Sequence, residues 1–188
     1  MFCKKQRYCI KETSMIMERN LLIIGAGIYG LVAYEIAADM GCFEKIGFAD
    51  DSREISCNGV KVEGGVSDLS VYADTYTDMV VAIGNPDVRL SLIEKIKQQT
   101  GRGATSLISP RAYVSSSAVV MDGCIIEPMS VVHSNCVLST GCIISAGAVV
   151  NHASECSDGV HVDCNATVAG NRIVPVGFKV QSGTVYNA

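Results

Sequence analysis

Aliphatic residues recur at every sixth position through the second half of the chain. The repeat keeps one register from Ile108 to Val180, and each repeating residue except Cys156 is Val, Ile or Leu. A period of six fits neither an α-helix nor an alternating strand, but it is typical of a triangular coil with one face per hexad. The pattern therefore predicts a left-handed parallel β-helix of hexapeptide repeats. Its repeating residues are Ile108, Val114, Val120, Ile126, Val132, Leu138, Ile144, Val150, Cys156, Val162, Val168, Val174 and Val180.

A second position in each hexad indicates where the coil turns. Four residues after each aliphatic residue stands a residue that is usually small, such as Ala118, Cys124 or Ala148. In many hexads glycine comes directly before it, where a tight corner needs a permissive backbone. These glycines are Gly123, Gly141, Gly147, Gly159, Gly177 and Gly183.

Short apolar segments alternate with segments of helical spacing in the first half of the chain. This order predicts a small Rossmann-like α/β unit with a parallel sheet. Pro86 suits the first turn of its second helix. The expected strands cover residues 21–24, 45–49, 79–83 and 105–108, and the expected helices cover residues 31–40 and 87–99.

The first predicted strand ends in a G-x-G-x-x-G pattern formed by Gly25, Gly27 and Gly30. Such glycines let the backbone approach phosphate oxygens, which the following helix N-terminus also attracts. Asp50 and Asp51 end the second strand, where a carboxylate can accept hydrogen bonds from a ribose. Because only one half of a dinucleotide-binding domain fits here, a uridine diphosphate sugar is favoured over NAD. Alternatively, the glycines serve helix packing alone.

These patterns divide the chain into three parts. Residues 1–20 are expected to be a disordered extension, residues 21–106 a Rossmann-like nucleotide-sugar-binding domain, and residues 107–188 the β-helix domain. The extension carries five Lys and Arg residues without the apolar core of a targeting peptide, and Met17 is an alternative start to Met1.

Composition narrows the possible partners and the compartment. The formal net charge is −4, so nothing indicates a nucleic-acid partner or a basic membrane-binding patch. No apolar run approaches the ~18 residues that a membrane span needs. The chain has nine cysteines, an odd number that cannot pair completely in disulfides, and none of them forms a C-x-x-C pair. We expect reduced thiols in a cytoplasmic protein, with no metal site.

The order of the two halves resembles the bacterial sugar O- and N-acetyltransferases of the sialic acid and bacillosamine pathways. The resemblance covers about residues 20–185, and its most telling segments are VVNH at 149–152, DGVHV at 158–162 and AGN at 169–171. In the first half, IGAG at 24–27, ADD at 49–51 and AIGN at 82–85 are also similar. The resemblance implies an acyltransferase that uses acetyl-CoA as cosubstrate and acetylates an amino or hydroxyl group of a nucleotide-linked sugar.

The resemblance also implies roles for individual residues. His152 matches the general base, Gly170 matches a glycine whose backbone N–H faces the thioester oxygen, and His161 matches a second histidine near acetyl-CoA. Because His152 and Gly170 are eighteen residues apart, we expect them on adjacent coils, ~4.8 Å apart along the stack. His133 is expected to be an exposed side chain. The residues that match the sugar-nucleotide site are Gly25, Gly27, Asp50, Asp51 and Asn85.

Two departures from the family pattern bear on the expected assembly. Many relatives place an acidic residue after the base, whereas this chain has Ala153, with Glu155 and Asp158 the nearest carboxylates. Relatives also continue for another coil beyond the position of Ala188, so either a partner subunit completes the pantetheine groove or acetyl-CoA binds more weakly. We expect a homotrimer, in which an outward apolar row supplies contacts. That row is Val119, Ile125, Val131, Val137, Ile143 and Val149.

Several other classes of protein remain as alternatives. A non-catalytic sugar-nucleotide-binding β-helix protein would be consistent with Ala153. A serine-type acetyltransferase would leave the nucleotide-like unit without a role, and an NAD-dependent oxidoreductase would need a larger first domain. A γ-type carbonic anhydrase binds zinc through histidines at spacings that differ from the nineteen and nine found here. The sequence identifies neither the acceptor sugar nor O- against N-acetylation.

Overall fold

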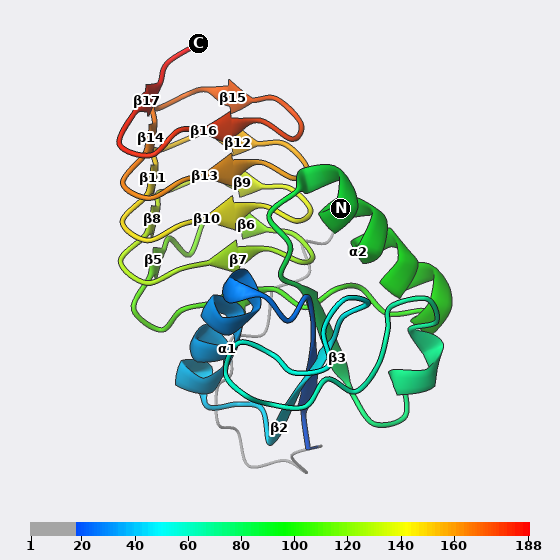
Figure 1. Ribbon diagram of the computed structural model, residues 1–188. Helices are drawn as coiled ribbons and strands as arrows, with labels where there is room; N and C mark the ends of the chain where they lie inside the picture. The colour runs from blue at the N-terminus through cyan, green and yellow to red at the C-terminus, as the bar shows by residue number, and fades with distance from the viewer. Residues whose placement is uncertain (1–17) are drawn as a thin grey trace.

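The computed structural model describes residues 18–188, which form an α/β unit followed by a β-helix (Figure 1). The expected extension lies largely outside the described residues. Its last two residues nevertheless belong to the folded unit, because Arg19 pairs with Asp78 at 2.6 Å and Asn20 opens the first strand. Within the described part, no helix combines the length and the apolar character needed to cross a membrane.

The α/β unit is a three-stranded parallel sheet with helices on both faces. Its elements are β1 (Asn20–Ile24), α1 (Ile28–Met40), β2 (Lys45–Ala49), the 3-10 helix η1 (Ser70–Tyr72), β3 (Asp78–Val81) and α2 (Pro86–Thr100), with strand order β2-β1-β3. Leu21 and Ile23 pack on the α1 side, and Leu22 and Ile24 pack on the α2 side. Apolar strands covered on both faces are typical of parallel sheets.

The second half is the predicted parallel β-helix. Each strand residue pairs with the residue eighteen positions away, as Ile126 does with Ile144 and Ile144 with Val162. Its strands are β4 (Leu107–Ile108), β5 (Tyr113–Val114), β6 (Val119–Val120), β7 (Ile125–Ile126), β8 (Val131–Val132), β9 (Val137–Leu138), β10 (Ile143–Ile144), β11 (Val149–Val150), β12 (Glu155–Cys156), β13 (His161–Val162), β14 (Thr167–Val168), β15 (Ile173–Val174), β16 (Lys179–Val180) and β17 (Val185–Tyr186).

These strands form three sheets, which we name after a central strand. The β10 face contains β4, β7, β10, β13 and β16; the β11 face contains β5, β8, β11, β14 and β17; and the β12 face contains β6, β9, β12 and β15. The chain visits the faces in that order, so the corner between the β11 and β12 faces lies opposite the β10 face. This geometry decides which side chains can meet.

The predicted repeat positions build the core of the β-helix. From Val120 to Val180 every repeating residue is at most 6% exposed. The six predicted corner glycines have φ angles between 66° and 71°, a region that glycine adopts without strain. Four free thiols fill space inside the coils and are fully buried: Cys124, Cys136, Cys142 and Cys156.

The expected fourth strand of the α/β unit belongs to the β-helix instead. Only Leu107 and Ile108 form a strand there, and they pair with Ile125 and Ile126 of the next coil. The small sheet therefore has three strands. Residues 101–106 connect the end of α2 to β4, the first strand of the β-helix.

The α/β unit covers the β10 face of the β-helix. Ile125 and Ile143 are 0% and 1% exposed. The expectation that these two residues supply outer apolar surface is therefore wrong, because the α/β unit covers them. The rest of that row lies outside the β10 face and is partly or largely exposed: Val119, Val131, Val137 and Val149.

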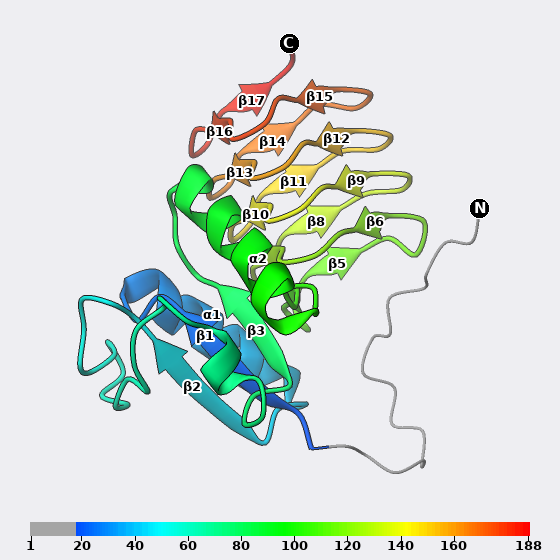
Figure 2. The same cartoon turned by 90° about the vertical axis from the view of Figure 1, so that its right-hand side faces the viewer.

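Helix α2 lies along a column of corner glycines at the edge of the β10 face (Figure 2). A Cβ atom at Gly159 would come within 3.0 Å of the Leu90 side chain, and one at Gly141 within 2.9 Å of Ile93. Residues three or four apart in a helix advance about 5 Å, close to the ~4.8 Å between coils. Successive turns of α2 therefore have nearly the same spacing as the corner glycines of successive coils, so each turn can pack against one glycine.

Arg89 holds this junction together from inside. Its side chain is fully buried and donates hydrogen bonds to the carbonyls of Gly141 (2.8 Å) and Gly159 (2.7 Å) in the β-helix. It also donates to the carbonyls of Ile83 and Gly84, after β3, at 2.8 and 2.9 Å. One guanidinium group thus connects two coils of the β-helix to the loop that follows β3.

Replacing Arg89 should loosen the two halves of the molecule. Arg89→Met keeps much of the apolar stem but leaves the buried carbonyls of Gly141 and Gly159, and two partly buried carbonyls, without this donor. We expect a loss of about 3 kcal/mol of unfolding free energy. Arg111→Met removes an exposed pair with Asp39 and should cost less than about 1 kcal/mol. Chemical denaturation measures both values. Equal effects of the two substitutions would contradict this role for Arg89.

Candidate active site

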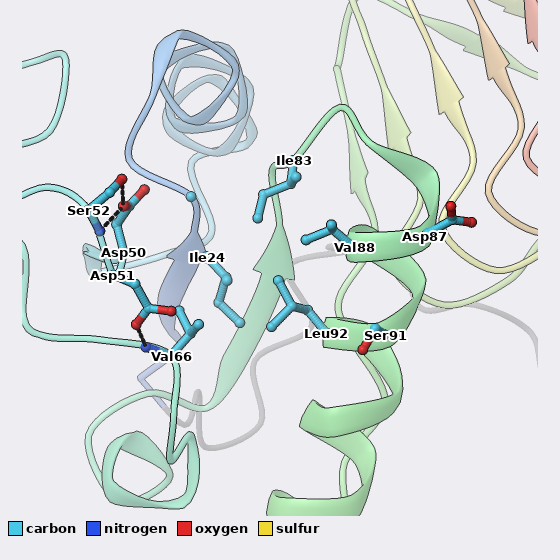
Figure 3. Close-up of a pocket in the computed structure, with 11 residues that line it drawn as sticks. Ile24, Asp50, Asp51, Ser52, Val66, Ile83, Asp87, Val88, Ser91 and Leu92 are labelled. Carbon is cyan, nitrogen blue, oxygen red and sulfur yellow. Dashed lines mark hydrogen bonds between the residues drawn. The ribbon is translucent and has the colours of Figure 1, made fainter.

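A pocket of ≈ 610 Å³ opens at the carboxyl end of the three-stranded sheet (Figure 3). Its walls come from the ends of β1 and β2, the segment after β3 and the first turns of α2. In open α/β sheets, ligands bind in the crevice at this end of the strands. The lining residues are Ile24, Gly25, Asp50, Asp51, Ser52, Val66, Ile83, Asp87, Val88, Ser91 and Leu92.

Two carboxylates shape one wall of this pocket. Asp50 accepts hydrogen bonds from the backbone N–H of Ala26 in the glycine-rich turn and from both the N–H and the hydroxyl of Ser52, all at 2.8 Å. Partial burial would raise the pKa of Asp50, but these hydrogen bonds outweigh burial and lower the pKa below its usual value. Asp51 accepts from the N–H of Val66 at 2.8 Å. Asp50 is therefore held next to the glycine-rich turn, and Asp51 is held next to the segment that contains Val66.

The other predicted pocket residues divide into two groups. Gly25 lines the pocket with φ at +106°, and a Cβ atom there would lie 2.8 Å from the Ala82 carbonyl oxygen. Gly27 is the N-cap of α1, and the Asn85 side chain caps α2 by accepting from the N–H of Val88 at 3.1 Å. Gly27 and Asn85 therefore set the starts of the two helices rather than lining the pocket.

His152 and Gly170 lie against each other on adjacent coils, as the eighteen-residue spacing predicts. His152 is exposed at the corner that follows β11. A Cβ atom at Gly170 would be 2.7 Å from the His152 Cε1 atom. The absence of a side chain at Gly170 therefore makes room for the imidazole ring.

Asn151 fixes the proton on the His152 ring. The Asn151 Oδ1 atom lies 2.8 Å from the backbone N–H of His152 and 2.8 Å from its Nδ1 atom. Since the backbone N–H can only donate, this oxygen is an acceptor, and Nδ1 must carry the ring proton. The Nε2 atom then keeps its lone pair, which is the form that a general base needs.

The group that orients His152 is therefore an amide rather than a carboxylate. Ala153 adopts a left-handed backbone with φ at 54°. Asp158, one of the two nearest carboxylates in the sequence, accepts instead from the backbone N–H of Thr140 at 2.9 Å. Sequence comparison with the family directed attention to position 153 and missed the contact made by Asn151, although Asn151 adjoins the histidine.

His161 occupies a different part of the β-helix. It belongs to β13 on the β10 face, beneath the α/β unit, whereas His152 lies at the opposite corner. Chiefly burial, together with the Lys179 cation, lowers the pKa of His161 to about 4. His161 is therefore neutral at physiological pH. His133 is exposed, as expected, and within residues 18–188 no cluster of His, Cys, Asp and Glu could hold a metal ion.

Sequence reasoning also missed a polar column beside His161. It runs along the corner between the β10 and β11 faces, one residue per coil, and consists of Ser109, Glu127, Ser145, Asp163 and Gln181. Glu127 is 8% exposed and Ser145 is 3% exposed. The eighteen-residue period could have revealed this column, since no apolar residue interrupts it.

A nucleotide-sized pocket on half of a Rossmann-like unit, joined to hexapeptide coils that present a histidine with a free Nε2, defines the class of β-helix acyltransferases. Comparisons with known proteins agree with this class. Residues 20–96 match the family model described as the PglD N-terminal domain. No curated protein gives a significant match.

Solved structures give the more specific comparison. The acetyltransferase domain of PglB from Neisseria gonorrhoeae FA1090 is 32% identical, with a TM-score of 0.77 over 89% of this chain and 85% of that chain. The same domain in complex with acetyl coenzyme A is 31% identical, with a TM-score of 0.75 over 90% and 85%. The chain therefore belongs to the sugar acetyltransferase family that this domain represents.

A more distant structure shares the fold. A mutant of perosamine N-acetyltransferase from Caulobacter crescentus, in complex with CoA and GDP-perosamine, is 22% identical, with a TM-score of 0.56 over 88% of this chain and 90% of that chain. The shared architecture is the short α/β unit followed by a left-handed β-helix.

The contact between His152 and Gly170 can be tested directly. Gly170→Ala should push the imidazole away from its place and reduce acyl transfer by roughly tenfold or more, since misplacing a reacting group is costly. The unfolding free energy should change by less than about 1 kcal/mol, because an exposed side chain can move aside. Enzyme assays and thermal unfolding measure the two effects. Undiminished turnover would show that the ring position does not matter.

Proposed function

We propose that this protein transfers the acetyl group of acetyl-CoA to an amino or hydroxyl group of a nucleotide-linked sugar, with His152 as the general base. The observation that carries the proposal is the His152 ring itself, with its proton held on Nδ1 by Asn151 and its Nε2 atom free. A neutral imidazole with a free Nε2 lone pair can accept the proton that the attacking amine or hydroxyl loses.

The proposed chemistry needs few groups from the protein. As Nε2 of His152 removes a proton, the acceptor nitrogen or oxygen attacks the thioester carbonyl and forms a tetrahedral intermediate. Its oxyanion requires a donor, and we assign this role to the backbone N–H of Gly170. Among residues 18–188, no hydrogen bond engages that N–H. Collapse of the intermediate releases the CoA thiol, which takes up the proton, and leaves the acetylated sugar.

Two observations support the two substrates. The PglB acetyltransferase domain, which is 31% identical in this form, was solved with acetyl coenzyme A, and we assign the same cosubstrate here. In the assembly proposed below, the His161 near it belongs to the neighbouring chain. The pocket beside Gly25, Asp50 and Asp51 has the place and size of a mononucleotide site. A nucleotide-linked sugar is favoured for that pocket, in line with GDP-perosamine in the distant relative.

We further propose that the active protein is a homotrimer. The α/β unit of each chain covers the β10 face, and His152 projects from the corner opposite that face. A sugar held by one chain therefore cannot reach the base of the same chain across the β-helix. A cyclic trimer would bring the base of one chain to the pocket of its neighbour, with three equivalent sites.

Removing the His152 side chain tests the proposed base. His152→Ala should lower turnover by roughly 10²–10⁴-fold, the usual contribution of such a group, with little change in acetyl-CoA affinity. The fold should survive because the side chain is exposed. A thiol-release assay with acetyl-CoA and a panel of nucleotide amino sugars measures the rate.

His133→Ala is the matched control, since it removes an exposed histidine that lies on the preceding coil. It should leave turnover within about twofold. Near-wild-type activity of His152→Ala would assign the base elsewhere. A wild-type protein that binds a nucleotide sugar but transfers nothing to any acceptor would contradict the proposed enzyme and favour a binding protein.

A further inference from the structure

A buried carboxylate joins the α/β unit to the β-helix beside His161. Glu127 follows β7, and its Oε1 atom accepts hydrogen bonds from the hydroxyls of Tyr29 and Ser145, each at 3.2 Å. Its Oε2 atom accepts from the backbone N–H of Ala146 at 3.1 Å. Burial raises the pKa of Tyr29 well above its usual range, so this hydroxyl stays a donor. Burial raises the pKa of Glu127, whereas its three hydrogen bonds act in the opposite direction and lower it. Three donors that converge on the two oxygens suit an ionised carboxylate.

Ser145 forms a hydrogen bond with both Glu127 and His161, so the direction of the first bond determines the direction of the second. Its hydroxyl has one proton, which is directed at Glu127, so the same oxygen must accept at its other contact, the His161 Nε2 atom at 3.0 Å. Nε2 therefore carries the proton of the neutral ring. The Asp163 Oδ1 atom, 3.8 Å from Nε2, favours the same arrangement through its negative charge.

We propose that Glu127 is a positioning residue of the transfer site: through Ser145 it keeps the proton of His161 on Nε2 and leaves Nδ1 as an acceptor for a substrate N–H or O–H group. Among the described residues no hydrogen bond involves Nδ1, and the one buried side-chain polar atom without a partner there is Asn20 Oδ1. Nδ1 is therefore not completely buried, in a side chain that is 18% exposed. The effect on turnover rests on the proposed function, whereas the proton position can be measured on the protein alone.

Glu127→Gln should reverse the direction of the chain of hydrogen bonds. The Ala146 N–H cannot accept, so the amide oxygen of the new side chain must face it, and the amide nitrogen must face Ser145. The Ser145 hydroxyl then accepts from the amide and donates to Nε2 of His161. The ring proton moves to Nδ1, and the acceptor is lost.

The proton position is read from proton–nitrogen correlation spectra of isotope-labelled protein at neutral pH. We expect the Nε2–H tautomer in the wild type and the Nδ1–H tautomer in Glu127→Gln. Tyr29→Phe is the matched control, because it removes one donor to Glu127 and leaves the path through Ser145 intact, so it should keep Nε2–H. A wild-type Nδ1–H tautomer, or an unchanged tautomer in a folded Glu127→Gln, would overturn the proposal.

Kinetics test the consequence for the substrate. Loss of one hydrogen-bond acceptor should lower kcat/KM in Glu127→Gln by about two- to tenfold, with Tyr29→Phe within about twofold of the wild type. An altered tautomer with unchanged kcat/KM would refute the positioning role. If the wild type transfers no acetyl group, the proposed function fails, while the spectra still decide where the proton lies.

Discussion

The parallel pairing of each residue with the one eighteen positions earlier is the constraint on which the site depends. It stacks side chains in columns ~4.8 Å apart, so chemistry is organised by position within the coil rather than by distance along the chain. His152 and Gly170 form one such column, and Glu127 and Ser145 form another. The corner glycines form a third, which makes room for α2 and thereby for the pocket at the carboxyl end of the sheet. A shift of register in the coil of residues 143–160 would disrupt all three, because that coil contains Ser145, His152 and Gly159.

We assign the ring protons of the two histidines to different nitrogen atoms. In each case, the side chain that sets the direction of the hydrogen bonds is an acceptor, because it is bound by a backbone N–H. Asn151 is fixed by the backbone N–H of His152, and Glu127 is fixed by the backbone N–H of Ala146. Accordingly, His152 keeps Nε2 free, and we place the proton of His161 on Nε2. Backbone donors anchored in the coil therefore set the direction of the hydrogen bonds that reach both rings.

The fold and much of the pocket could be predicted because their signals are local. Thirteen hexads with one register specify the coil, and the glycine pattern after an apolar strand specifies the turn that contains Gly25. The covering of Ile125 and Ile143 could not be predicted in this way, since a hexad shows that a side chain points outward but not what packs on it. The Tyr29–Glu127 contact joins residues 98 positions apart and depends on how the halves dock.

The pocket of the α/β unit and His152 lie on opposite sides of the β-helix. This arrangement leads to the central claim, that a sugar bound by one chain meets the base of its neighbour. The most direct test is a mixed trimer of two inactive variants, purified by a different tag on each. One variant is His152→Ala, and the other is Ser91→Trp, which fills the pocket.

In every mixed trimer, one site combines an intact pocket from one chain with an intact His152 from the next. We predict that light scattering will give the mass of three chains and that activity will return to about one third of the wild-type value. If pocket and base act within one chain, every site carries a defect. Mixed trimers without activity would therefore contradict the account.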